Sequence, residues 1–512
     1  MRQNCIFRER QSPALPAARG RLLVLIGLLC LTTAHTNGQT ATNENLSKQV
    51  EQLTEAMVRA QAQLEQSQRD LEQMRGQLVA LQQKMAAPNT EASAATAAAK
   101  LAAQVDELRE RQDVQEAQIA THDQAKVESE SKYPLKLSGL VLLYGFVNTR
   151  GLDNPVTPTI SLSGAGSTGA SIQQTILGFD ARGPHLWGAQ SYADLHVDFD
   201  GGSLSSSYNT GGLLRLRTAH AGLRWERTAA FFSMDHPLLN PNTPTSLTAV
   251  AVPALAWSGN LWTWNPQVGV THDIQLSTRR QLRMEAAMID ISDPPPVYDR
   301  PASVTSSTVA QAGTAELSRW PGVETRFALL GGQQQDSGVQ VGVGGIFAPR
   351  RTFGGTRFYT WAGTLDYRLP LARRTELTGS FYRGQALGGL GGGGYKDYVY
   401  RPDPDSPHNF YYLFVDDMGG WAQLKQHATQ RLEFNAAFGI DNVPAGQLRP
   451  YAGPASAVYL NLARNRTYTG NVIYSPSAYL LFSLEYRHLE SSPVNGSTTA
   501  GDIIGVATGY RF

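Results

Sequence analysis

Cysteine is almost absent from this chain. The only two cysteines among its 512 residues, Cys5 and Cys30, lie near the N-terminus. The remainder of the sequence has no thiol, which excludes a disulfide framework and thiol chemistry there. A chain without thiols also cannot become cross-linked when it crosses an oxidising compartment before folding.

Long hydrophobic runs are missing as well. After residue 34 no stretch approaches the roughly 18 uncharged apolar residues that a membrane-spanning helix needs. Mean hydropathy is −0.28, and 17% of the residues are charged. The sequence therefore excludes a helical membrane protein. It leaves open a membrane barrel, in which half of the strand residues face a polar interior and lower the average hydropathy.

Residues 1–38 have the layout of a secretory signal peptide. An apolar core occupies residues 22–31 and small or polar residues follow it, so we expect cleavage near Ala34 or Gly38. Cys30 follows Leu29, where lipid-attachment sites carry a small residue, and this disfavours a lipoprotein anchor. The basic region before the core contains Arg2, Arg8, Arg10, Arg19 and Arg21.

Residues 39–130 favour a helical coiled coil, which we expect in the periplasm. Apolar residues recur there at alternating steps of four and three, the heptad pattern of helices that pair. Pro88 and an Ala/Thr-rich run break the pattern near residues 86–99, and polar residues occupy seam positions beyond the break. Oligomerisation is favoured over a solvated single helix, whereas dimer and trimer both remain open. The seam positions are Leu46, Val50, Leu53, Met57, Ala60, Leu64, Leu71, Met74, Leu78, Leu81 and Met85.

Residues 131–512 change to an apolar period of 2, which is typical of β-strands with one apolar face. Residues 357–369, 431–439 and 477–489 each alternate apolar and polar residues, and the last alternating segment ends at Phe512. A soluble β-sandwich would show the same alternation. In strands such as 135–147 both faces are apolar, so alternation alone does not identify the lipid face there.

The connections between strands favour a transmembrane barrel over a sandwich. Tight turns such as 371–374 and 475–477 exchange with long Gly/Pro/Ser/Asn loops, as in outer-membrane proteins. At roughly 10 residues per strand, the region accommodates about 16 to 18 strands, and we choose 16 because such barrels have even counts. The predicted fold is therefore an all-β transmembrane β-barrel of about 16 antiparallel strands, preceded by the α-helical coiled coil. A barrel of this size encloses an aqueous channel.

Aromatic residues and long loops complete this prediction. Aromatic side chains near strand ends are expected to form girdles at the membrane interfaces: Trp225, Trp257, Trp262, Trp264, Tyr411, Tyr412 and Trp421. Long loops are expected at roughly 151–170, 201–211, 234–248, 292–320, 386–408, 441–455 and 491–500. The glycine-rich residues 388–394 lack the Lys-Ser/Thr of a phosphate loop and are interpreted as a flexible external loop.

Three short segments resemble known outer-membrane proteins. The C-terminal Gly-Tyr-Arg-Phe resembles the recognition signal of barrels that the assembly machinery inserts, which makes Tyr510 and Phe512 its candidates here. The segment NVIYSP at residues 471–476, with LEYR at 484–487, resembles the penultimate hairpin of DcaP-like porins, and LRLRTAH at 214–220 resembles their arginine-bearing early strand. The resemblance implies a coiled coil ahead of a trimeric 16-stranded barrel. Tyr474 departs from the family, which tends to have Trp there.

Candidate pore residues follow from the early strand. If Leu214 and Leu216 face lipid, Arg215 and Arg217 point into the lumen, and the resemblance places such arginines near the constriction. Arginine binds carboxylates and phosphates bidentately, which suits an anion path. Alternatively, both arginines pair with acidic residues of the preceding strand and stiffen the wall; the two interpretations are compatible. The acidic candidates are Asp194, Asp198 and Asp200.

Residues 234–256 are the candidate for an inward-folded loop. They begin with Asp235 and His236, continue with repeated Asn, Pro and Thr, and include an apolar run that a solvated exterior would not favour. An ordinary transmembrane strand is the alternative interpretation.

Enzymatic and nucleic-acid functions find no support. Histidine is scarce and not at metal-ligand spacing, so we expect no metal, no cofactor and no catalytic residues. The formal net charge of +1 and an acidic coil, with 9 basic and 15 acidic residues in 39–130, argue against nucleic-acid binding.

The function expected from the sequence is an outer-membrane porin. It would allow passive diffusion of small hydrophilic solutes with a mild preference for anions, as a homo-oligomer, most simply a trimer, in contact with outer-membrane lipid. The alternative is a structural protein whose coil tethers the outer membrane to the cell wall or a periplasmic partner. A trimeric adhesin and a plugged receptor are disfavoured, because the chain has neither an external head nor a globular plug domain.

Overall fold

The structure, a computed structural model, describes residues 135–202, 212–294, 312–332 and 338–512, with no side chains for 406–409. The predicted signal peptide and coiled coil lie outside the described residues. Within the described ranges no helix is long and apolar enough to cross a membrane.

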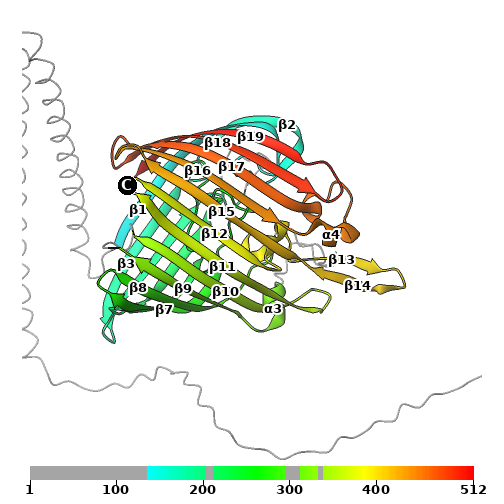
Figure 1. Ribbon diagram of the computed structural model, residues 1–512, viewed down its shortest axis with the longest axis horizontal. Helices are drawn as coiled ribbons and strands as arrows, with labels where there is room; N and C mark the ends of the chain where they lie inside the picture. The colour runs from blue at the N-terminus through cyan, green and yellow to red at the C-terminus, as the bar shows by residue number, and fades with distance from the viewer. Residues whose placement is uncertain (1–134, 203–211, 295–311, 333–337) are drawn as a thin grey trace, which may run out of the picture. The chain divides into compact units, whose positions relative to one another are not determined.

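The described residues form a closed antiparallel barrel of 16 strands (Figure 1), which confirms the predicted count. Each strand is paired with its neighbours, and β1 pairs with β19 to close the ring. The wall consists of β1 (Leu135–Leu152), β3 (Ile176–Leu186), β4 (Ala189–Asp198), β5 (Arg215–Arg224), β6 (Thr228–Asp235), β7 (Asn265–Ser277), β8 (Arg280–Ile289), β9 (Gly322–Gly331), β10 (Val339–Arg351), β11 (Arg357–Ala372), β12 (Thr375–Gln385), β15 (Asp416–His427), β16 (Leu432–Asn442), β17 (Leu462–Tyr474), β18 (Leu480–Pro493) and β19 (Thr499–Arg511).

One edge of β1 is divided between two partners. Its first part, up to Leu140, pairs with β3, and its later part, from Tyr144, pairs with β2 (Ser161–Ser171). Residues 161–171 were expected to belong to a long loop, and that prediction is wrong. β2 consists almost entirely of Ser, Gly, Ala and Thr, so its sequence lacks the alternation of large apolar and polar residues that identifies a strand. This strand was therefore missed.

The remaining elements lie at the end of the barrel opposite Phe512. They are a two-stranded hairpin that projects from the barrel (Figure 1) and several short helices. The hairpin is formed by β13 (Tyr398–Asp403) and β14 (Ser406–Phe414). The helices are α3 (Thr314–Ser318), α4 (Ala445–Leu448) and α5 (Val458–Asn461), with 3-10 turns at Gly388–Leu390, Gly393–Tyr395 and Arg449–Tyr451.

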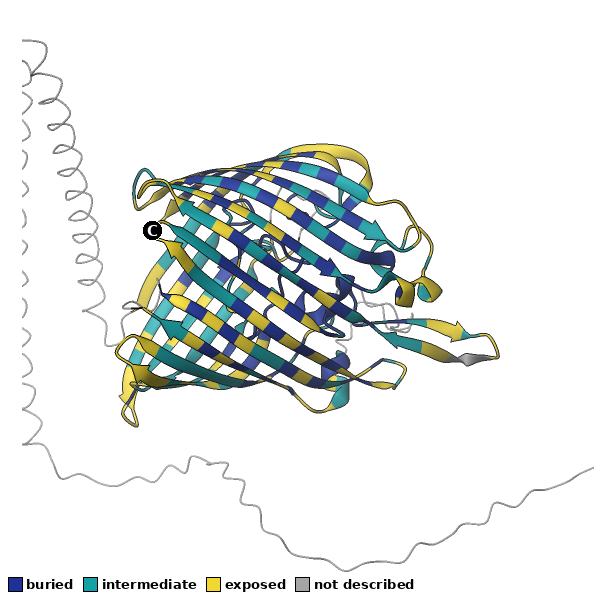
Figure 2. Cartoon of the chain, viewed as in Figure 1, coloured by how far each residue is buried: buried dark blue, intermediate teal, exposed yellow. Residues whose placement is uncertain are grey.

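Exposure alternates along the strands, as the period of 2 predicts (Figure 2). In β11, Tyr359, Trp361 and Leu365 are exposed on the outside, whereas Phe358 and Thr360 are buried on the inside. An outward row of large apolar side chains is what a lipid-facing barrel surface requires. Short turns join the strands at the Phe512 end, for instance residues 187–188 and 373–374, and long connections join them at the other end.

The predicted aromatic girdle is wrong for several of its members. Trp257, Trp264 and Trp421 are at most 9% exposed and lie within the barrel, not on its rim. Trp421 occupies an inward position of β15, and the other two belong to a loop inside the lumen. Their position is the first sign that the lumen of this barrel is partly filled.

Both faces of β1 are apolar because its inward face packs against a loop inside the lumen. Inward-facing Leu142 is fully buried in a core with Leu247, which belongs to the connection between β6 and β7, and with Leu481 and Ala507 of the neighbouring wall. An apolar inward face is therefore not a second lipid face. It is the part of the lumen wall that a loop covers.

Candidate pore constriction

The connection between β6 and β7, residues 236–264, folds into the lumen. No strand is present between Asp235 and Asn265, so the transmembrane-strand interpretation of 234–256 is wrong and the inward-folded loop is confirmed. Leu239, Asn260 and Leu261 are at most 1% exposed. We call residues 236–264 the luminal loop.

Polar side chains of the far wall hold the backbone of the luminal loop. The Leu238 N–H donates to Glu324 Oε2 of β9 at 2.9 Å, and the Thr245 N–H donates to Gln423 Oε1 of β15 at 2.6 Å. The Ser246 hydroxyl donates to the Glu485 carboxylate of β18 at 2.6 Å. The loop therefore crosses from β6 to the opposite wall and satisfies its backbone there, as a buried loop must.

Glycine allows the closest approach between the luminal loop and the wall. Gly259 has φ +97°, a left-handed conformation that disfavours other residues, and a Cβ at this position would lie 2.1 Å from the Gly420 carbonyl oxygen. A Cβ at Gly439 of β16 would lie 2.1 Å from the Ser258 carbonyl oxygen. The loop backbone thus rests directly on the wall backbone of β15 and β16.

Arg215 and Arg217 both lie inside the barrel, while Leu214 and Leu216 are exposed outside. Arg215 binds Asp198 bidentately at 2.9 and 2.6 Å and donates to the Ala251 carbonyl at 2.9 Å. Arg217 donates to the Val250 carbonyl and lies 3.6 Å from Asp198. The arginines therefore pair with acidic residues, as the alternative interpretation had it, and also hold the near side of the luminal loop.

The same two arginines keep part of their surface open. Their side chains are 25% and 17% exposed, and each guanidinium lies 5.1 Å from the ring centre of Trp264. Asp200 lies 3.6 Å from Arg215, and burial raises the pKa of Asp200 to about 6. Two cations thus face two acidic residues, one of which changes charge just below neutral pH.

A bulge in β5 brings a histidine to the same face. The pairing register between β4 and β5 shifts next to Arg217, so His220 points inward together with the two arginines. Its Nδ1 lies 2.6 Å from Asp194 and its Nε2 lies 2.8 Å from Asp235. An imidazole between two carboxylates is held as the cation, because both of its nitrogens then donate.

His236 has a different environment from the other candidates. Its ring packs against Trp264 with centres 5.7 Å apart, and burial lowers its pKa. The structure therefore brings together Arg215, Arg217, Asp198 and Asp200 in one group and Asp194, His220 and Asp235 in the next. His236 belongs to the aromatic core of the luminal loop.

A second segment, residues 386–397, also folds inward and packs on the luminal loop. Tyr395 stacks on Trp257 with ring centres 3.8 Å apart, and Ile160 and Leu462 complete this core. The interpretation of the glycine-rich residues 388–394 as a flexible external loop is wrong, since all of them are buried. Their small size lets this segment fit between the luminal loop and the wall.

Wall carboxylates bind the backbone of this second segment. The Gly393 and Gly394 N–H groups donate to Asp417 and Asp441 at 2.7 Å each. Lys396 is fully buried and donates to the Gly394 and Leu462 carbonyls at 2.6 and 2.7 Å, and burial lowers its pKa to about 7. These polar anchors fix the segment in the lumen.

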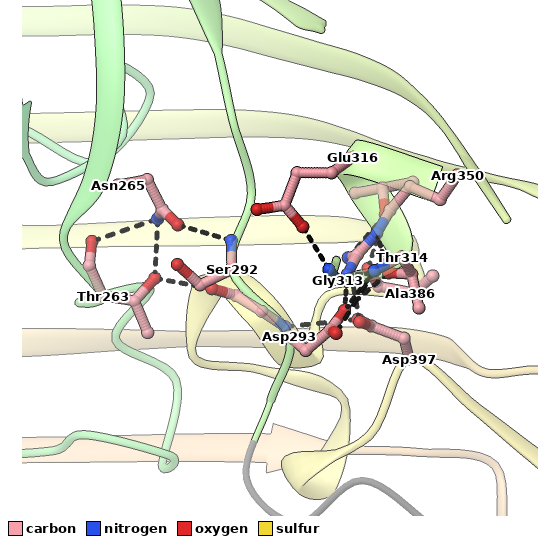
Figure 3. Close-up of polar contacts among 12 residues, drawn as sticks. Thr263, Asn265, Ser292, Asp293, Gly313, Thr314, Glu316, Arg350, Ala386 and Asp397 are labelled. Atoms are coloured by element: carbon pink, nitrogen blue, oxygen red, sulfur yellow. Dashed lines mark hydrogen bonds and ion pairs between the residues drawn. The ribbon is translucent and has the colours of Figure 1, made fainter. Parts of the chain in front are cut away.

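Arg350 of β10 joins two connections, the one between β8 and β9 and the one between β12 and β13 (Figure 3). Its guanidinium is fully buried and pairs with Asp293 at 2.7 Å and with Asp397 at 2.8 Å, and it also donates to the Thr314 hydroxyl at 2.8 Å. In the same view the Thr263 hydroxyl of the luminal loop donates to the Gly389 carbonyl at 2.7 Å. Ion pairs and hydrogen bonds within the barrel therefore connect the loops at this end to one another.

Solved structures resemble this barrel, although sequence comparisons do not find relatives. No protein-family model matches the chain, and no curated protein matches it. The outer membrane channel DcaP of Acinetobacter baumannii superposes with a TM-score of 0.54 at 16% identity, over 75% of this chain and 99% of that one. This chain has a porin-like fold.

Two further porins match more distantly. The anion-selective porin from Comamonas acidovorans has a TM-score of 0.46 at 10% identity, over 74% of this chain and 100% of its own. OmpF of Salmonella typhi in complex with daunomycin has a TM-score of 0.45 at 12% identity, over 74% of this chain and 98% of its own.

The C-terminal candidates lie at the seam of the porin-like barrel. Phe512 exchanges two backbone hydrogen bonds with Gly139 at 3.0 and 3.1 Å, and Tyr510 is exposed on the outer surface. Their predicted role as an assembly signal stays a prediction.

Sequence reasoning missed the wall residues that anchor the luminal loop, the second inward segment and the neighbouring connections. Glu324, Asp417 and Arg350 sit at inward positions of otherwise ordinary alternating strands, and nothing in the local sequence distinguishes them from water-facing charges. Within the described ranges, no group of three or more His, Cys, Asp or Glu side chains is placed to hold a metal ion.

Proposed function

We propose that this protein is an outer-membrane porin through which small hydrophilic solutes diffuse passively, with a mild preference for anions. The observation that carries the proposal is the luminal loop, which crosses the lumen of the closed barrel from β15 and β18 to the wall at Arg215 and Arg217 of β5. There the side chains of Arg215, Arg217 and His220 retain exposed surface. Arginine donors at a narrow point lower the electrostatic barrier for carboxylates and phosphates.

The proposed setting follows the expectations from the sequence. The outward apolar rows face outer-membrane lipid, residues 1–38 direct secretion, and residues 39–130 form a coiled coil in the periplasm. The barrel-assembly machinery recognises the strand that ends in Tyr510 and Phe512. Three copies, each with its own channel, associate as a trimer, and no cofactor or catalysis takes part.

Planar-bilayer recording of the purified full chain tests this function. We expect discrete conductance steps and, in a potassium chloride gradient, a reversal potential on the chloride side. Absence of any step conductance would contradict the channel. A reversal potential on the potassium side would contradict the anion preference while leaving the channel intact.

A further inference from the structure

The positive charge at the constriction is largely cancelled. Arg215 and Arg217 face Asp198 and Asp200, and the cation at His220 lies between two carboxylates. Paired charges of this kind create only a weak field a few ångströms away. The constriction alone therefore supports only a mild anion preference, and uncompensated positive charge elsewhere in the lumen adds to it.

Two inward arginines nearer the short-turn end have no acidic partner. The cross-strand pairing places Arg182 of β3 next to Tyr192 of β4, on the same face as Asp194 and His220. The guanidinium of Arg224, at the end of β5, lies 4.9 Å from the centre of the Tyr192 ring. Among the residues that the structure describes, no carboxylate forms an ion pair with Arg182 or Arg224.

The wall is shaped to hold this aromatic ring flat. Tyr192 pairs with Gly222, and a Cβ at that glycine would lie 3.1 Å from the tyrosine hydroxyl. The ring therefore lies across Gly222, and Arg224 stacks on it. A guanidinium stacked on a ring keeps its N–H edges available for an oxyanion, because stacking uses only its face.

The other charges that face this part of the lumen leave it positive. Lys136 of β1 pairs across the sheet with Asp180 of β3, two positions from Arg182 on the same inward face. Asp194 lies directly across the sheet from Asp180, but His220 already binds it at 2.6 Å. Three cations thus face Asp180 and a carboxylate that is already paired. Arg217 and Arg224 are seven residues apart in β5, which separates them by about 23 Å along the wall. This group is therefore distinct from Arg215 and Arg217 at the constriction.

We propose that Arg182 and Arg224, arranged around Tyr192, form a second oxyanion subsite in the vestibule at the short-turn end of the lumen. The inference rests on the proposed porin function. The subsite attracts carboxylates and phosphate, and it adds uncompensated positive charge to the path whose narrow point is lined by Arg215 and Arg217.

Bilayer recording of three variants tests the subsite. We expect R182Q/R224Q to lower the chloride-to-potassium permeability ratio by roughly two- to five-fold. Arg383→Gln removes an arginine next to Met418 on the outer surface and should leave the ratio unchanged. R283Q/D273N removes an inward ion pair, joined at 2.8 and 2.9 Å, and should also leave it unchanged.

Inorganic phosphate distinguishes binding from a general charge effect. Phosphate added on the short-turn side should block chloride current in the wild type and not in R182Q/R224Q. R182K/R224K should keep the permeability ratio but weaken the phosphate block, because lysine keeps the charge and lacks the bidentate fork. Heat-modifiable migration of each variant verifies its folding.

The failures of the two proposals are separable. An unchanged permeability ratio in folded, conducting R182Q/R224Q, or an equal loss in R383Q, would overturn the subsite. A wild type without step conductance would overturn the porin function itself.

Discussion

Asp200 gives the constriction a charge that depends on pH. It lies beside Arg215, and burial raises its pKa to about 6. A carboxyl with a raised pKa is charged above that value and neutral below it. The pairing of two arginines with two acids therefore holds at pH 7 and is broken at pH 5, where one positive charge becomes uncompensated.

The first prediction concerns selectivity and pH. We expect the chloride-to-potassium permeability ratio of the wild type to rise by about two-fold as pH falls from 7 to 5, because Asp200 takes up a proton. Reversal potentials recorded at both pH values measure the ratio. Asp200→Asn should show the higher ratio at both values, and an equally strong pH dependence in that variant would assign the effect to another group.

Individual charged residues were only partly predictable. Their inward direction follows from the alternation around Leu214 and Leu216, so Arg215 and Arg217 could be assigned to the lumen. Their acidic partners Asp198 and Asp200 were among the predicted candidates. Their backbone partners Val250 and Ala251 belong to the luminal loop, and the local sequence does not reveal them. His220 was out of reach because a strict period of 2 does not anticipate the bulge beside Arg217.

Among the elements of the fold, the luminal loop depends on backbone contact with β15 and β16. Gly439 is its tightest support, since a Cβ there would lie 2.1 Å from the Ser258 carbonyl oxygen. Backbone atoms cannot retreat as a flexible side chain can. Any side chain at this position displaces the loop from the wall.

The second prediction is a pair of glycine substitutions. Gly439→Ala should displace the luminal loop, change the single-channel conductance and lower the heat-modification temperature, corresponding to about 1–3 kcal/mol of overpacking strain. Gly363→Ala in β11 places its Cβ in open space and serves as the matched control. Equal behaviour of the two variants in both measurements would show that the loop does not rest on Gly439.

The strands were predictable and the luminal segments were not, for one physical reason. A wall strand has lipid on one side and the lumen on the other, so its sequence alternates. That pattern and the length of the region left 16 to 18 strands open, and the even counts of such barrels favoured 16. A loop inside the lumen is buried like a core but is rich in Gly, Pro and Asn like a surface loop. Trp257 and the glycine-rich residues 388–394 were therefore assigned to the membrane rim and to solvent.

For the whole molecule, we expect the barrel wall and the loops folded inside it to unfold together on heating. The third prediction is that the unboiled, detergent-solubilised protein migrates as a trimer and that boiling shifts it to the position of a single chain of 55.6 kDa before signal removal. Gel electrophoresis with and without boiling measures this. Closed barrels resist detergent because every strand is hydrogen-bonded on both edges. Migration of the unboiled sample at a monomer position would contradict the trimer.

The seam between β1 and β19 determines when the chain can become stable. It joins Leu140 to Arg511, so the ring closes only through residues at opposite ends of the barrel sequence. Until that contact forms, both terminal strands are open edges that can pair with other chains. Pairing between such distant segments is slow, because the chain loses the entropy of closing the loop before the stabilising contacts form. A chain truncated at the C-terminus lacks the partner of β1, so we expect it to aggregate instead of forming a smaller barrel.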